Sequence, residues 1–444
     1  MSNTISALTY TLIIIAIYFL GNPKKAYFGN YIAFFSILIA IFYSLTMLPL
    51  KHIIPVISII LLGAITSIIL SSHIKIPNLP QIVAIFNGFG GISSAFIGLT
   101  EIELNNHHQI LIISIISLGF ITFSSSFATY IKLQNIKSPI PTKHLNLINL
   151  ILLISLIITT FYTFLDFPKH IYIFSILSSL LGFFFVLTIG GADMPIIISI
   201  LNSCSGLTTI LVGFSLNNIL LIIIGTIITS SGFILTHAMT KAMNRKFSNI
   251  FFNHSHSTVL QTKNNHINQA TPKDAAFLLE NAHKIIIIPG YGLASSNAQH
   301  ELSNMTNILK NKYHIDVKFA IHPVAGRMPG HMNVLLAEAN ISPQDIFELN
   351  DINQEFKTTD IALIIGANDI TNPLAKTLKN SSIYQMPILE AQHAKRIIVI
   401  KRSLSPGYAG IDNPLFYLDK TLMLLGDAQT TLKQIISILE ASTS

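Results

Sequence analysis

The residues with the clearest capacity for chemistry follow a very apolar run in the second half of the chain. In the stretch KIIIIPGYGLASSNAQH, residues 284–300, four isoleucines precede Gly290, Gly292 and Ser295. This is the spacing of the dinucleotide-binding turn G-x-G-x-x-G/A, in which glycines let the backbone approach a pyrophosphate at a helix N-terminus. The same pattern also occurs in simple strand-to-helix turns. Further residues must therefore support a cofactor site.

Charged residues at the ends of other predicted strands indicate the kind of dinucleotide. An NAD site normally has Asp or Glu about 20 residues after the glycines, where it holds the ribose 2′-hydroxyl. Here the second strand ends in the letters AIHP, without a carboxylate. A different strand ends in Lys401, Arg402 and Ser403, and two cations with a hydroxyl suit a dianionic phosphate. We therefore predict NADP(H), with a solvated basic pair on an edge strand as the alternative.

The segments that must position these residues alternate between strand and helix patterns. Apolar strands are predicted in KIIIIP, DVKFAIHP, IFELN, DIALIIGAND, RIIVIKRS and TLMLLGDA, with helices such as 293–310 between them. This alternation predicts a Rossmann-like, doubly wound parallel α/β sheet. Such sheets bind ligands at the carboxyl ends of their strands. We therefore include Asp427 and Ala428, which follow the last strand.

The first half of the chain is far more apolar than the second. Overall, 51% of the 444 residues are hydrophobic, 11% are charged, and the mean hydropathy is +0.60. Runs of about 20 apolar residues are long enough to cross a bilayer as helices. The sequence predicts a polytopic all-α membrane domain of about nine transmembrane helices, near residues 5–20, 28–48, 53–71, 82–100, 109–131, 145–165, 171–190, 196–214 and 217–239.

The basic residues predict how these helices are oriented. Lysine and arginine concentrate in alternate connections, so the positive-inside rule places the N-terminus outside and the C-terminal domain in the cytoplasm. The net charge of +7 is interpreted in this way and not as a sign of nucleic-acid binding. The predicted organisation is a transmembrane domain over 1–246, a linker over 247–270 and a nucleotide domain over 271–444. The N-terminal run is interpreted as a retained span in a bacterial cytoplasmic membrane.

Few residues suggest metal or thiol chemistry. Cys204 is the single cysteine, which excludes an intrachain disulfide and a multi-cysteine metal cluster. It is interpreted as a small packed residue. The histidines of the predicted linker, His254, His256 and His266, are interpreted as solvated side chains. No metal site is predicted.

Three polar residues lie within or next to the predicted membrane spans. Asp193 stands in GGADMP, and Asn87 and Asn202 stand in apolar runs close to glycines. Polar groups inside a bilayer are costly, which favours a function such as a hydrated proton path. The alternative is that the asparagines hold neighbouring helices together. His237, near the end of the last span, is a weaker candidate.

Several long motifs resemble one known family over nearly the whole chain. PGYGLA, HPVAGRMPGHMNVLLAEA, IGANDITNP, MPILE and KRSLSPGYAGIDNPLF resemble the NADP(H)-binding domain of proton-translocating NAD(P) transhydrogenase. IGGADMPIIISILNSCSG and KAMNR resemble its membrane domain. The chain is similar to the family's separate beta subunit. An NAD-binding alpha partner, in one or two chains, is then implied, with a dimer of alpha–beta units as the expected assembly.

The resemblance implies an activity and a set of site residues. Hydride would pass from NADH on the partner to NADP⁺ on this chain, coupled to inward proton movement, with the dinucleotide reversed relative to the usual pose. Lys401, Arg402 and Ser403 would then read the 2′-phosphate. Residues 405–410 match a lid, and 366–369 match a loop beside the nicotinamide. The further implied contacts are Tyr291, Ala294, Val324, Ala325, Gly326, Arg327 at the phosphates, Met328, Gly366, Ala367, Asn368, Asp369, Gly407, Tyr408 over the nucleotide, Ala409 and Gly410.

Two residues carry the expected coupling between nucleotide and protons. Asp369 is the candidate for a carboxylate whose protonation changes how tightly NADP(H) is held; its alternative role is to cap the turn NDITNP. Asn87 departs from family members that have histidine at the matching position. Because asparagine does not titrate, we expect the alpha partner to supply that histidine.

A regulated channel or transporter and a membrane-anchored dehydrogenase are the two alternative classes of protein. A channel or transporter regulated by a nucleotide-sensing domain would be expected to keep the second-strand carboxylate. A membrane-anchored dehydrogenase would need a His or Tyr acid–base, for which His322 and His331 are available. Both alternatives fit the motifs less well than a transhydrogenase subunit.

Overall fold

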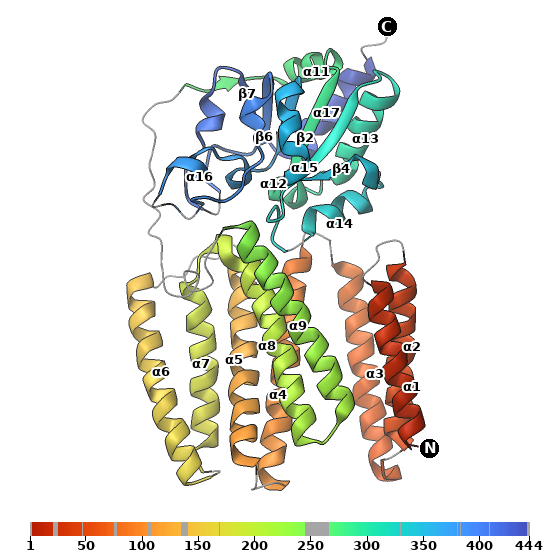
Figure 1. Cartoon of the computed structure of the whole chain (residues 1–444), viewed down its shortest axis with the longest axis vertical. Coiled ribbons are helices and arrows are strands. Elements are labelled where there is room, and N and C mark those ends of the chain that lie inside the picture. The colour runs from red at the N-terminus through yellow and green to blue at the C-terminus, as the bar shows by residue number, and fades with distance from the viewer. Residues whose placement is uncertain are drawn as a thin grey trace.

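The computed structural model contains a helical domain followed by an α/β domain (Figure 1). It describes residues 2–20, 25–46, 48–74, 78–104, 108–134, 141–167, 169–244, 266–328, 330–379, 381, 383–407 and 409–441. The predicted linker lies mostly outside the described residues. The division into an apolar helical region and a parallel-sheet domain confirms the predicted fold class.

The helical domain consists of long apolar helices. Within the described residues they are α1 (Ser2–Leu20), α2 (Ala26–Thr46), α3 (Leu50–His73), α4 (Leu79–Leu104), α5 (Gln109–Leu133), α6 (Thr142–Leu165), α7 (Ile171–Thr188), α8 (Met194–Ser215) and α9 (Ile219–Ala242). Eight of these described helices, α2 to α9, are long and apolar enough to cross a membrane. In α1 the apolar portion is shorter, Ala7–Phe19.

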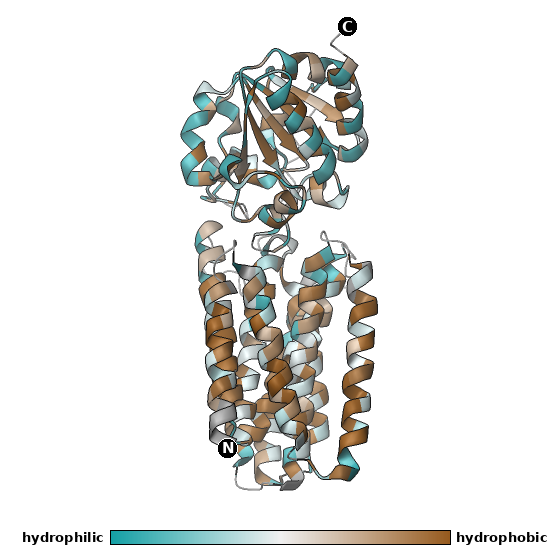
Figure 2. Ribbon diagram, turned by 90° about the vertical axis from the view of Figure 1, so that its right-hand side faces the viewer, coloured by the Kyte–Doolittle hydropathy of each residue, from teal (hydrophilic) through white to brown (hydrophobic). Residues whose placement is uncertain are grey.

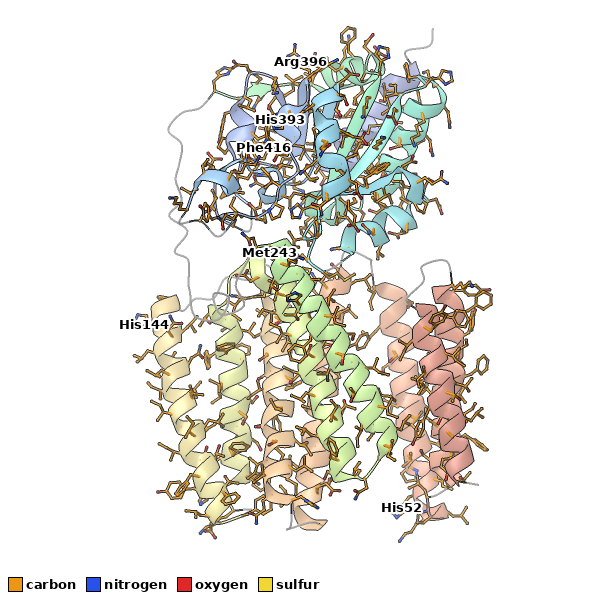
Figure 3. All side chains as sticks on the ribbon, in the orientation of Figure 1. His52, His144, Met243, His393, Arg396 and Phe416 are labelled. Carbon is orange, nitrogen blue, oxygen red and sulfur yellow. The ribbon has the colours of Figure 1, made fainter. Side chains whose placement is uncertain are left out.

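The helices alternate in direction, as expected for a multi-pass bundle. Figure 3 shows His144 and Met243 at the end next to the α/β domain and His52 at the opposite end. The N-terminus also lies at that remote end (Figure 1). Helices α4, α5, α7, α8 and α9 pack against one another. In contrast, the Leu50–Leu70 stretch of α3 contains no buried residue. The interior of the helical domain is therefore formed mainly by α4, α5 and α8 with their neighbours.

Close helix packing in this interior depends on small residues. A Cβ atom added at Gly206 of α8 would lie 2.9 Å from the carbonyl oxygen of Gly225 on α9, and one at Gly225 would lie 2.7 Å from that of Gly206. Gly91 of α4 and Gly119 of α5 approach each other in the same way. Such contacts bring helix backbones together where lipid supplies no hydrophobic driving force between helices.

The α/β domain is built on a parallel sheet. Its strands are β1 (Asn268–Gln269), β2 (Lys284–Pro289), β3 (Asp316–Ile321), β4 (Ile346–Glu348), β5 (Ile361–Ile365), β6 (Arg396–Lys401) and β7 (Thr421–Leu425). They run in the order β1-β7-β6-β5-β2-β3-β4 and all neighbours are parallel. Figure 2 shows the apolar strands enclosed by more polar helices. Strand order reverses between β2 and β5, and ligands of open α/β sheets bind at such a crevice.

The helices of this domain follow the predicted pattern with two differences. They are α11 (Pro272–Glu280), α12 (Tyr291–Ser295), α13 (Gln299–Asn311), α14 (His331–Glu338), α15 (Leu349–Ile352), α16 (Leu374–Thr377) and α17 (Ala428–Ala441). The single helix expected over 293–310 is divided into α12 and α13, because Asn297 takes a positive φ of 50° between them. Strand β1 lies within the stretch predicted as linker.

Candidate functional site

A cavity lies at the junction of the two domains, at the carboxyl ends of β2, β5 and β6. The α/β domain lines it with residues of four loops: Gly290, Tyr291, Gly292, Val324, Ala325, Gly326, Arg327, Gly366, Ala367, Asn368, Asp369, Ile370, Ile383, Met386, Lys401 and Gly407. The helical domain closes it with Leu133, Gly191, Met194, Pro195 and Met243. Figure 3 shows Met243 at the top of α9, directly below the α/β domain.

This cavity is small for a dinucleotide. Its volume is about 220 Å³, whereas ligand pockets typically hold ~300–1,000 Å³. A whole dinucleotide would therefore extend beyond this cavity or require it to widen.

The glycines of the predicted turn bring two loops into direct contact. The N–H of Gly292 donates to the carbonyl of Gly366 at 2.9 Å. A Cβ atom added at Gly292 would lie 2.4 Å from the Cα atom of Gly366, which itself has a φ of +64°. The turn after β2 and the turn after β5 can cross this closely only without side chains. The glycine spacing therefore forms the crevice at which strand order reverses.

Asp369 contacts the described residues of the segment predicted to form a lid. Its Oδ2 atom accepts a hydrogen bond from the N–H of Ala409 at 3.0 Å, and a Cβ atom added at Gly407 would lie 2.5 Å from its Oδ1. The carboxylate thus joins the loop after β5 to Gly407 and Ala409. Tyr408, predicted to cover the nucleotide, lies outside the described residues.

Lys401 is a cation partly withdrawn from water beside this carboxylate. Burial lowers its pKa to about 8, and the nearby Asp369 and Asp412 carboxylates oppose that shift. Its ammonium donates to the carbonyl of Ser405 and lies 5.0 Å from the centre of the Phe416 ring. Lys401 is therefore mostly charged below pH 8 and loses its charge above it, which makes its attraction for a phosphate pH-dependent.

Arg402 and Ser403 directly follow β6 and do not line the cavity. The guanidinium of Arg402 forms an exposed ion pair with Asp427 after β7, with Nη2 3.0 Å from Oδ2. The hydroxyl of Ser403 donates to that of Ser405 at 3.0 Å. A phosphate bound here would have to share or replace Asp427 as the partner of Arg402.

Arg327 connects the cavity to the membrane helices. Its side chain is buried, with its guanidinium 4.0 Å from the centre of the Tyr291 ring. Its Nη1 atom donates to the carbonyl of Leu133, the last residue of α5. A cation at a helix C-terminus interacts favourably with the exposed carbonyl dipoles. The residue predicted at the phosphates therefore also contacts the helical domain.

The other predicted cofactor residues support the loops without lining the cavity. Ala294 is fully buried in the core, and the Ser295 hydroxyl donates to the carbonyl of Gly292 at 3.2 Å. Met328, Ala409, Gly410 and Ala428 likewise lie outside the cavity wall.

His322 and His331 are buried and hold the loop that carries Arg327. His322 Nε2 lies 2.7 Å from the carbonyl of Pro387, and its Nδ1 accepts the N–H of Val324 at 3.2 Å. His331 Nδ1 accepts the N–H of Arg327 at 3.1 Å. Burial lowers the pKa of each ring to about 4. Both histidines are therefore neutral at physiological pH, and neither lines the cavity, which argues against the dehydrogenase alternative.

Asp193 lies at the domain end of the helical bundle. It is buried at the start of α8 and interacts electrostatically with Lys132 near the end of α5. The Lys132 ammonium also donates to the carbonyl of Ile189. The adjacent residue Leu133 is the one that Arg327 contacts, so a charged pair of the membrane domain lies next to the junction cavity.

Asn87 and Asn202 belong to neighbouring helices, α4 and α8. The side-chain amide of Asn87 donates to the carbonyl of Ile198 at 3.3 Å. That carbonyl is one helical turn before Asn202, which is half-buried. The contact is the helix-joining role considered for an asparagine, and it places the two amides at neighbouring levels of the bundle.

The structure also places functional groups that the sequence reasoning did not single out. Asp412 lies near Lys401 and accepts from the Tyr417 hydroxyl. Glu101 is buried in α4, which runs past the predicted span end at 100 to Leu104. Among the described residues, no group of three or more metal-binding side chains occurs; His254 and His256 lie outside them.

The fold and site together define a membrane protein with a nucleotide-type α/β domain whose crevice faces the helices. Residues 2–438 match the family described as NAD(P) transhydrogenase beta subunit. The NAD(P) transhydrogenase subunit beta of Rhodospirillum rubrum is 39% identical over 446 residues, covering 96% of each chain, and the sequence from a named strain of that organism matches equally. The chain belongs to the family of NAD(P) transhydrogenase beta subunits, as its motifs predicted.

Proposed function

We propose that this chain binds NADP(H) in the junction cavity, and that hydride transfer from NADH on an alpha partner to NADP⁺ is coupled to inward proton movement through the helical domain. The observation that carries the proposal is the shared wall of the cavity. Loops of the sheet line one side, and the ends of α5, α8 and α9 line the other. A change at the nucleotide can thus reach the membrane helices directly.

The residues present fit a dinucleotide phosphate better than a neutral ligand. Arg327 is a buried cation at the cavity, and Lys401 and Arg402 stand at one strand end. Arginine and lysine side chains suit phosphate oxygens, and the crossing glycine loops leave room for close backbone approach. The bound cofactor supplies the hydride chemistry, and the protein aligns, orients and excludes water.

The role proposed for each group follows from its contacts. Lys401 and Arg402 attract the 2′-phosphate, and Arg327 attracts the linking phosphates. Asp369 holds the lid through the Ala409 N–H and keeps Lys401 charged. Coupling then requires two conformations that differ both in nucleotide affinity and in protonation, so that each equilibrium biases the other. The cytoplasmic location of the α/β domain, the bacterial inner membrane and the dimer of alpha–beta units are part of the proposal.

Coupled transport in vesicles tests this function. Alpha and beta subunits co-purified and reconstituted should reduce an NADP⁺ analogue with NADH while the luminal pH, read by a trapped dye, changes in step. Asn202→Leu should lower this coupled rate at least fivefold and leave NADP(H) binding unchanged, because leucine removes a polar group from the path. Exchange of hydride by the wild-type complex without any proton movement would refute the coupled function. A fully coupled Asn202→Leu complex would remove only Asn202 from the path.

Cofactor preference is tested at Arg402. Arg402→Ala should reduce the preference for NADP(H) over NAD(H) by about tenfold or more, because a charge-assisted hydrogen bond contributes about 1.5–3 kcal/mol. The measurement is the ratio of the two dissociation constants in the complex. Arg396→Ala is the matched control, since it removes an exposed arginine at the opposite end of the same strand and should not change the preference. An unchanged ratio in Arg402→Ala would contradict the 2′-phosphate assignment.

A further inference from the structure

Glu101 is a carboxylate buried in the helical domain at the end remote from the α/β domain. It lies in the last turn of α4 and is 6% exposed. The hydroxyl of Ser215, the last residue of α8, donates to its Oε2 atom at 3.3 Å. Burying an ionisable group at such a position is costly, and intramembrane carboxylates commonly serve ion or proton pathways.

Glu101 belongs to a stripe of buried polar residues along α4. Asn87, Ser94 and Glu101 are spaced by seven residues, so they lie on one face of the helix, and all three are buried. The stripe covers about 21 Å at 1.5 Å per residue. It begins about two turns into α4 and ends at the end of the bundle remote from the α/β domain.

Polar groups of the neighbouring helix α8 lie beside this stripe along its length. Asn87 contacts the carbonyl of Ile198, a Cβ atom at Gly90 would lie 2.4 Å from the Ser205 hydroxyl oxygen, and Glu101 contacts Ser215. The two helices therefore stay side by side from the level of Asn87 to that of Glu101. Asp193, immediately before α8, continues the polar groups to the domain end.

Only some of these groups can change protonation state. Amide and hydroxyl side chains do not titrate at physiological pH and can only hold or relay water, whereas a carboxyl group can gain and lose a proton. Among the buried residues that join α4 and α8, Glu101 is the titratable group at the remote end. Asp193 has the corresponding position at the domain end.

We propose that Glu101 is the group that takes up protons at the outer end of the path along α4 and α8. This inference rests on the proposed function, which makes the remote end the outer one. An O–H bond forms on the carboxylate when a proton arrives from outside water. The same bond breaks when the proton moves on toward Asn87, so no electron is transferred and no other group is consumed.

The test compares Glu101 variants in reconstituted alpha–beta vesicles. Glu101→Gln should lower both coupled hydride transfer and luminal pH change at least tenfold. Hydride exchange between NADH and an NAD⁺ analogue through NADP(H) that stays bound should keep its wild-type rate, because it requires no proton to cross. Asp166→Asn is the matched control: it removes an exposed carboxylate between α6 and α7 at the same end of the bundle and should have no effect.

Chemical rescue separates proton transfer from helix packing. Formate in the outer medium should restore at least a third of the coupled rate to Glu101→Ala, and Glu101→Asp should pump at a reduced rate with the wild-type ratio of protons to hydride. A coupled rate within twofold of wild type in Glu101→Gln would overturn the proposal. So would a failure of formate to restore Glu101→Ala.

The remaining outcomes distinguish the role of Glu101 from the proposed function as a whole. If the complexes with Glu101→Gln and Glu101→Ala do not assemble, Glu101→Asp is the deciding variant. A parallel loss of hydride exchange and proton pumping in Glu101→Asp would assign Glu101 a packing role and overturn the proposal. If wild-type vesicles themselves move no protons, the proposed function fails as a whole. Wild-type pumping with unaffected Glu101 variants overturns the role of Glu101 alone.

Discussion

Replacing Asp369 with asparagine is expected to weaken NADP(H) binding by tenfold to a hundredfold and to lower coupled transhydrogenation at least as much. The carboxylate accepts a hydrogen bond from the Ala409 N–H, in the proposed lid, and helps to keep the Lys401 ammonium charged. A hydrogen bond to a charged group contributes about 1.5–3 kcal/mol, which corresponds to that range of affinity. The measurements are the dissociation constant of NADP(H) and the coupled rate in vesicles.

The pH dependence of Asp369→Asn gives a sharper result. The pKa of Lys401 is about 8 with Asp369 present, and loss of that negative charge lowers it further. At pH 6 Lys401 is protonated in both proteins, whereas near pH 7.5 it is more often neutral in the variant. The loss of NADP(H) affinity should therefore grow as pH rises from 6 toward 8. Asp316→Asn is the control, because Asp316 is exposed at the start of β3, at the end of the parallel strands opposite to the cavity. An affinity loss that is equal at both pH values would contradict the role assigned to Lys401.

Arg327→Gln should have the second large effect, because one guanidinium serves both domains. It lies at the cavity, on the Tyr291 ring, and donates to the carbonyl that ends α5. The same guanidinium would bind the phosphates and donate a hydrogen bond to the end of α5. We expect NADP(H) affinity to fall at least tenfold and the ratio of protons moved to hydride transferred to fall with it, as measured by calorimetry on the complex and by dye in vesicles.

The matched control is Arg396→Gln. Arg396 lies at the start of β6, at the end of the α/β domain remote from the membrane helices (Figure 3). It should leave both affinity and coupling unchanged. If Arg327→Gln lowered affinity but kept the proton-to-hydride ratio, the contact with α5 would have no part in coupling.

Most of the fold was predictable because the relevant patterns are local. Six apolar strands were identified at their observed positions, and the long apolar runs identified the membrane helices. The predicted helix over 293–310 was divided because Asn297 adopts a left-handed conformation, which local periodicity does not reveal. Glu101 was missed for a related reason: its burial depends on the end of α8, a segment more than a hundred residues away.

The sequence by itself determined the two classes of domain, the family and the residue types of a phosphate site, since hydrophobic run length, strand–helix alternation and glycine spacing are properties of neighbouring residues. Only the tertiary structure decided which of those residues meet. It placed Arg327 against α5, Asp369 against the lid, Arg402 on Asp427 and Glu101 beside Ser215. Each of these contacts joins segments far apart in the chain, and such contacts depend on how whole helices and strands pack.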